Sequence, residues 1–176
     1  MTEVGAATVT LDRADAVRDF ARSALFDRTF QDGMDLVEDT AAYLDGLGRQ
    51  ESRLLSRSAA LAYANHSMRL TTQLMQVASW LLVQRAVREG DMTAAEACED
   101  RYRLGRRPSA APVTNEEVAD DAADLPAGLK GLLERAERIY ERVAHLDASM
   151  YRGEPLEDVP HPVLSQHDRL RAAFGS

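Results

Sequence analysis

The stretch from residue 61 to residue 104 constrains the fold most, because most of it reads as one long helix with two apolar stripes. At about 100° per residue, the two stripes fall on nearly opposite sides of that helix. The first stripe contains Leu61, Ala64, Met68, Met75, Ala78, Leu82 and Ala86, and the second contains Tyr63, Leu70, Leu74, Val77 and Leu81. A surface helix needs only one apolar stripe. Two stripes predict neighbours on both sides, as in the middle of a bundle or across a dimer interface.

A narrower polar strip between the two stripes is the first candidate partner-binding surface. It consists of Arg69, Gln73, Gln76 and Trp80. An exposed tryptophan beside arginine and glutamine resembles the composition of interface hot spots. The strip is therefore interpreted as a dimer seam or as a cargo site. The alternative is an ordinary solvent-facing helix surface.

Apolar periodicity predicts two further long helices, over about residues 23–43 and 129–151. The first has a core stripe of Phe26, Phe30, Met34, Val37, Ala41 and Leu44. The middle helix should begin between residues 50 and 58, with Ser56 or Ser58 as N-cap, and end near Glu89 before Gly90. Thr93 and Glu96 form a capping-box pattern that opens a short helix to about residue 104. Strand signals are absent, so we expect an all-α antiparallel bundle of three long helices plus a short one.

Composition divides the chain into a bundle and flexible segments. We expect residues 1–20 to be a flexible N-terminus with at most a short helix around residues 14–20, and residues 21–152 to form the bundle. Acidic residues and prolines predict a largely disordered connector at about residues 105–127 within it. Residues 153–176 contain three prolines and should form a flexible tail. The apolar residues of this tail are spaced like short-motif anchors: Leu156, Val159, Val163, Leu164, Leu170 and Phe174. Three of them, Leu164, Leu170 and Phe174, are candidate partner contacts.

The charge of the chain disfavours nucleic-acid binding, and the spacing of its potential ligands disfavours a metal site. The formal net charge is −8 and the pI about 5.0, whereas nucleic-acid binders usually carry a basic excess. Glu141 and His145 are the best-spaced metal-ligating pair, but no second pair accompanies them, so a solvated contact is the preferred interpretation. We expect no metal, no cofactor and no enzyme activity. Two alternatives remain open, an enzyme of unrecognised type and a DNA-binding regulator. The second rests on the turn and short helix over residues 89–107, which resemble a helix-turn-helix unit with Arg101, Arg103, Arg106 and Arg107 at its end.

The absence of a secretory signal and of a long apolar run predicts a cytoplasmic protein without a membrane span. The longest apolar stretch, residues 77–83, is far below the roughly 20 residues that a bilayer requires.

The segment from Ser67 to Thr93, SMRLTTQLMQVASWLLVQRAVREGDMT, carries a specific family resemblance. It is similar to the core of the alphaproteobacterial regulator of CtrA degradation (RcdA) family, with a weaker match over residues 26–102 and 129–151. The resemblance implies an all-α, dimeric, non-enzymatic adaptor of the ClpXP protease. It implies as partners CtrA-like cell-cycle regulators, a response-regulator-type primer of the protease and a second copy of the chain. Recruitment to the cell pole belongs to the same set of expectations, and no catalytic residue is carried over.

Overall fold

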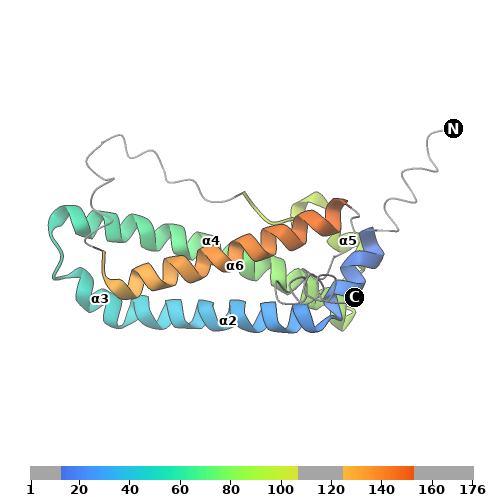
Figure 1. Ribbon diagram of the computed structural model, residues 1–176, viewed down its shortest axis with the longest axis horizontal. Coiled ribbons are helices and arrows are strands. Elements are labelled where there is room, and N and C mark those ends of the chain that lie inside the picture. The colour runs from blue at the N-terminus through green and yellow to red at the C-terminus, as the bar shows by residue number, and fades with distance from the viewer. Residues whose placement is uncertain (1–12, 107–124, 153–176) are drawn as a thin grey trace, which may run out of the picture.

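The computed structural model describes residues 13–106 and 125–152 and shows an elongated bundle of three long helices (Figure 1). These helices are α2 (Ala24–Asp45), α4 (Arg57–Glu89) and α6 (Ala127–Arg152). The shorter elements are α3 (Leu47–Ser52), α5 (Ala94–Ala97), the 3-10 helix η1 (Asp100–Tyr102) and a helix over residues 13–21. The described residues contain no strand, so the predicted all-α bundle is confirmed.

Two of the three long helices run parallel. Ion pairs join Asp32 to Arg142 and Asp39 to Arg135, so α2 and α6 are antiparallel. On α4, by contrast, Gln73 lies beside Ala136 and Trp80 lies beside Asp147, which makes α4 and α6 parallel. A parallel pair needs a connection that returns along the length of the bundle. The residues between Glu89 and Ala127 supply that connection, which explains why one pair departs from the antiparallel arrangement.

The buried face of α2 is rotated from the predicted stripe. Ser23 caps the helix, as its hydroxyl accepts the Phe26 N–H at 3.1 Å. The buried residues are Phe26, Thr29, Gly33, Leu36 and Thr40, whereas Phe30, Met34, Val37 and Leu44 are half-buried and Ala41 is exposed. A Cβ on Gly33 would lie 2.6 Å from Leu81 Cδ1 and 3.3 Å from Ile139 Cδ1. The missing side chain lets α4 and α6 pack closely against α2 here. A prediction based on the spacing of apolar residues does not identify a glycine as part of the buried face.

The limits of α4 follow local capping chemistry. Ser56 accepts the Ala59 N–H at 3.2 Å, and Gly90 ends the helix in the left-handed region at φ 85°. The predicted capping box of Thr93 and Glu96 is present. The helix that it opens is shorter than expected, however, because α5 ends at Ala97 rather than near residue 104. The chain then turns through η1 and leaves it in extended conformation at Arg103.

Residues 13–21 belong to the folded core, which begins before the expected boundary at residue 21. The predicted short helix is present, and its buried residues are Ala14, Val17, Phe20 and Ala21. The Phe20 ring lies 5.7 Å from the rings of Phe26 and of Trp80, so this helix covers one end of the bundle. The expected connector, apart from its first two and last three residues, and the expected tail lie outside the described residues.

Tyr43 organises the opposite end of the bundle. Its hydroxyl donates to Glu51 at 2.7 Å, which ties α2 to α3. Burial, followed by the contact with Glu51, raises the pKa of Tyr43 far above its usual value. Added Cβ atoms on Gly48 and Gly128 would lie 2.6 and 2.5 Å from the Tyr43 ring. Two glycines therefore let α3 and the start of α6 close against one tyrosine.

Candidate partner-binding surfaces

One face of α4 carries a row of exposed apolar side chains, which we call the α4 stripe. It consists of Leu61, Met68, Met75 and Leu82, which are 54, 70, 65 and 50% exposed. These residues belong to the first of the two predicted stripes and recur every seven positions. The second predicted stripe is buried instead: Leu70 and Leu81 are 0% exposed. Among the described residues α2 and α6 thus pack on the side of α4 that carries the second stripe, and the α4 stripe is exposed.

The predicted polar strip of α4 is not an exposed surface. Gln73 and Trp80 are 5 and 2% exposed, while Arg69 and Gln76 are half-buried. Gln73 Nε2 donates to the Ala136 carbonyl at 3.4 Å and to Glu137 at 3.3 Å. The strip is covered because α6 packs along it, and helical periodicity alone does not tell which side of α4 a third helix will occupy. The prediction of a solvent-exposed hot spot that contains Trp80 is therefore wrong.

Asp147 is the buried polar centre of this region. Its side chain is 8% exposed, and its carboxylate accepts the Trp80 Nε1–H at 2.9 Å and the Leu104 N–H at 3.3 Å. Arg103 completes the set with an ion pair at 3.2 Å. A carboxylate with three donors is well satisfied despite its burial. The sequence signal was a lone acidic residue between Val143 and Met150, on the apolar side of α6, which the sequence interpretation passed over.

The end of the short helix that the sequence predicts to about residue 104 is instead an extended segment held between α4 and α6. The Tyr140 hydroxyl donates to the Gly105 carbonyl at 2.7 Å, and Gln76 Nε2 donates to the Arg106 carbonyl at 3.1 Å. Two of the four strip residues, Gln76 and Trp80, thus act together with α6 in fixing this segment. Arg69 and Gln73 lie farther along α4, away from it.

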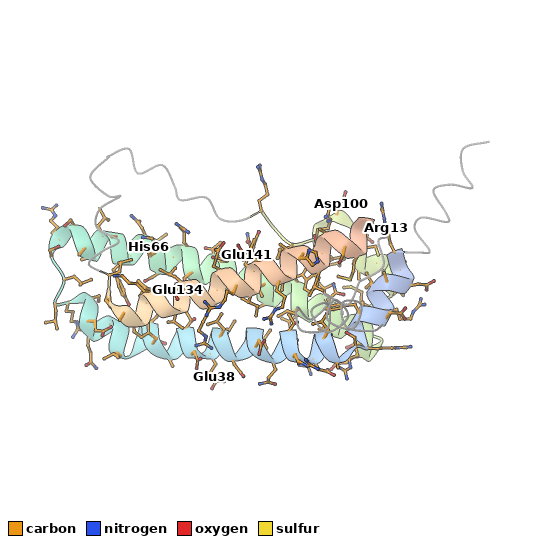
Figure 2. All side chains as sticks on the ribbon, viewed as in Figure 1. Arg13, Glu38, His66, Asp100, Glu134 and Glu141 are labelled. Carbon is orange, nitrogen blue, oxygen red and sulfur yellow. The ribbon has the colours of Figure 1, made fainter. Side chains whose placement is uncertain are left out.

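Exposed ion pairs join α2 to its two long neighbours. Asp32–Arg142 and Asp39–Arg135 are paired at 2.8 Å, and Asp27 contacts Arg88. Their side chains are between 42 and 58% exposed, so each pair contributes little to stability. Glu38 points away from the bundle in Figure 2. Three acidic side chains of α2 are therefore matched by arginines of α4 and α6.

Residues 89–106 do not form a helix-turn-helix unit. α5 contains four residues, which is barely one turn, and η1 contains three. A recognition helix must present several side chains to a DNA groove, and neither element is long enough. Arg101 and Arg103 are paired with Glu99 and Asp147. This arrangement gives the DNA-binding alternative no support.

The groups with nucleophile or ligand chemistry are dispersed in the described structure. Burial raises the pKa of the Cys98 thiol, with a smaller opposing effect of the Arg13 charge. Burial, and then the charge of Arg69, lowers the pKa of His66, which projects from α4 in Figure 2. Residues 13–106 and 125–152 contain no group of three or more metal-ligating side chains. None of their helices combines the length and the hydropathy that a membrane span requires. The candidate tail contacts Leu164, Leu170 and Phe174 lie outside the described residues.

These features define a class of protein. It is an all-helical bundle that presents an exposed apolar face of one helix, the α4 stripe. Comparisons with known proteins give the family. The model of a protein family described as a protein of unknown function (DUF1465) matches residues 17–174. The crystal structure of RcdA from Caulobacter crescentus CB15 is similar at 59% sequence identity and a TM-score of 0.61, over 77% of this chain and 98% of that chain. No protein of curated function matches. The chain belongs to the RcdA family.

Proposed function

We propose that this protein is a non-enzymatic adaptor that binds cell-cycle regulators such as CtrA and delivers them to the ClpXP protease. The observation that carries the proposal is the 59% identity with RcdA over 98% of that chain. The exposed α4 stripe supports it, because a row of apolar side chains in solvent is a common mark of protein contacts. A response-regulator-type primer of the protease, action in the cytoplasm and recruitment to the cell pole belong to the same proposal.

The direct test is reconstituted proteolysis. Purified ClpXP, the primer and a CtrA-like cargo are incubated with and without this protein, and cargo loss is followed over time. Adaptor function requires faster degradation that depends on the protein and saturates with its concentration. Degradation of a ClpXP substrate that needs no adaptor serves as control and should not change. If cargo is lost equally fast without the protein, the adaptor proposal fails.

The tail is proposed as the arm that couples to the protease, through Leu164, Leu170 and Phe174. Met150 is the last buried apolar residue of α6 whose side chain is described, and we expect truncation after Gly153 to leave helicity nearly unchanged. Short segments that order on contact bind with modest affinity, and loss of the tail should therefore weaken delivery rather than folding. Equal stimulation of cargo degradation by full-length and truncated protein would mean that the tail has no part in coupling.

We also propose a homodimer, formed through the α4 stripe. The stripe reads Leu, Met, Met, Leu at equal spacing, and such an order is the same in both directions. Two antiparallel copies related by a two-fold axis near residues 71 and 72 would place Leu61 against Leu82 and Met68 against Met75. A self-complementary patch is what an isologous interface requires. The stripe runs from Leu61 to Leu82, which is about 32 Å of helix and suits a helix–helix seam.

A further inference from the structure

Residues 103–106, which we call the strap, lie between α4 and α6 in a direction opposite to both helices. Leu104 lies beside Asp147, Gly105 beside Tyr140 and Arg106 beside Gln76. The three hydrogen bonds run to the strap backbone: from the Leu104 N–H, to the Gly105 carbonyl and to the Arg106 carbonyl. Every polypeptide carries these backbone groups. The helices therefore hold the strap largely as they would hold any extended chain of suitable shape.

The side chains of the strap add a simple pattern. Leu104 is half-buried and packs against the apolar core. A Cβ on Gly105 would lie 2.9 Å from Gln76 Nε2, so a larger residue would displace the amide that binds the Arg106 carbonyl. Arg103 adds the ion pair with Asp147. The groove thus fits a basic residue, a leucine-like residue and a glycine in succession.

Room and an unused acceptor lie beside the strap. A cavity of about 380 Å³ opens along α4, and its walls include Met75, Trp80, Val83 and Tyr102. Gln76 Oε1 is buried and has no hydrogen-bond partner among the described residues. A buried acceptor without a donor is costly. An N–H of an additional peptide residue in this cavity would satisfy it.

We propose that the groove between α4 and α6 is a receptor for an extended peptide of the basic–leucine–glycine pattern, which the strap occupies in cis. A partner segment of that pattern would displace the strap, bind Asp147, Tyr140 and Gln76 through its backbone, and reach into the adjoining cavity. In an adaptor such a segment would belong to a cargo or to the protease, and this assignment of the partner rests on the proposed function. The receptor itself does not, since it is tested with this chain and a peptide alone.

Trp80, the one tryptophan of the chain, reports on the strap because its indole N–H shares Asp147 with the Leu104 N–H. Leu104→Asp should release the strap, since it places a carboxylate in an apolar contact beside Asp147. Collisional quenching of Trp80 fluorescence by acrylamide should then rise about two-fold or more as the site opens locally. Arg106→Ala is the matched control, because that residue contributes its backbone carbonyl and its side chain is exposed. Helicity is followed by circular dichroism in both variants.

The decisive step is rescue in trans. A capped peptide with the sequence of residues 100–106 is titrated into the full-length Leu104→Asp variant. The tethered strap has an effective concentration in the millimolar range, so rescue is expected at about 0.1–1 mM peptide. The same peptide with aspartate in place of its leucine should not rescue. Unchanged quenching in a helical Leu104→Asp variant, or no rescue by either peptide, would overturn the proposal.

A variant that retains the strap sequence covers the possibility that Leu104→Asp loses helicity. Tyr140→Phe removes only the hydroxyl that binds the Gly105 carbonyl. It should raise amide hydrogen exchange at Leu104, and the peptide should lower Trp80 quenching in this variant. Exchange at Leu104 equal to that of the unaltered chain would count against the proposal.

Discussion

Gly33 lies where α2 packs against Leu81 of α4 and Ile139 of α6, and its lack of a side chain matters more than its low helix propensity. In an open helix interior, Gly→Ala stabilises by about 1 kcal/mol. At Gly33 the added methyl group would press on Leu81, which is fully buried and has little room to move. Overpacking of this kind costs about 1–3 kcal/mol, and it should outweigh the gain in helix propensity.

We therefore expect Gly33→Ala to lower the free energy of unfolding. Gly131→Ala is the matched control, because Gly131 is an exposed position of α6 where an added Cβ meets nothing within 4 Å. That substitution should raise the free energy of unfolding by about 0.5–1 kcal/mol. Urea denaturation followed by circular dichroism measures both. A stabilising Gly33→Ala would show that the helices can move apart at no cost.

Asp147 provides a second contrast at the residue scale, between a buried and an exposed carboxylate. Asp147→Ala removes the acceptor of the Trp80 indole and of the Leu104 N–H. Each buried donor left unpaired costs about 1–3 kcal/mol, so we expect a large loss in the free energy of unfolding. Asp32→Ala breaks an exposed ion pair and should cost less than about 1 kcal/mol. Equal losses in chemical denaturation would mean that water replaces the missing carboxylate at residue 147.

At the scale of elements, the end of α4 depends on a single backbone conformation. Gly90 has φ 85°, and its N–H and the two that follow bond to carbonyls of the last turn. Nothing lies within 4 Å of a Cβ added there, so Gly90→Ala would be unfavourable for conformational reasons alone. The expected loss is about 1 kcal/mol in the free energy of unfolding. Gly90→Asn should lose less, because asparagine adopts the left-handed region more readily.

Capping residues predicted the ends of the helices well, whereas hydrophobic periodicity predicted less well which face of each helix is buried. Ser23, Ser56, Gly90 and the capping box of Thr93 with Glu96 mark helix ends because capping is chemistry between near neighbours in sequence. The face that a helix buries depends instead on distant segments. The rotation of the buried face of α2 toward Gly33 and Thr29 follows from close helix approach, which hydrophobic periodicity does not encode.

The candidate site shows the same division. Periodicity identified both stripes of α4 but not which of them α6 and α2 would cover. Trp80 was predicted to bind a partner because it lies beside arginine and glutamine on the helix. Its role in the structure depends instead on Asp147, which is 67 residues away in the chain. The strap was missed because its contacts run to backbone atoms, and backbone atoms leave no trace in a side-chain pattern.

At the scale of the whole molecule, the exposed α4 stripe is the feature that a single chain leaves without a neighbour among the described residues. Burying large apolar side chains contributes about 1.5–3 kcal/mol each relative to leaving them exposed. Met68 and Met75, at the centre of the stripe, should therefore dominate a two-fold interface in which each faces the other across the axis. Replacement of both by glutamate would bring four carboxylates together at that axis.

We expect Met68→Glu with Met75→Glu to yield a monomer of 19.4 kDa, half the mass of the proposed dimer, in light scattering at micromolar concentration. Helicity should be unchanged, because both side chains are at least 65% exposed. Leu54→Glu is the control: Leu54 is 86% exposed but lies in the turn before α4, outside the stripe. This control should keep the mass of the unaltered protein. A monomeric unaltered chain would refute the dimer, and a dimer that survives both glutamates would place the interface on another face, which would leave the α4 stripe to a different protein partner.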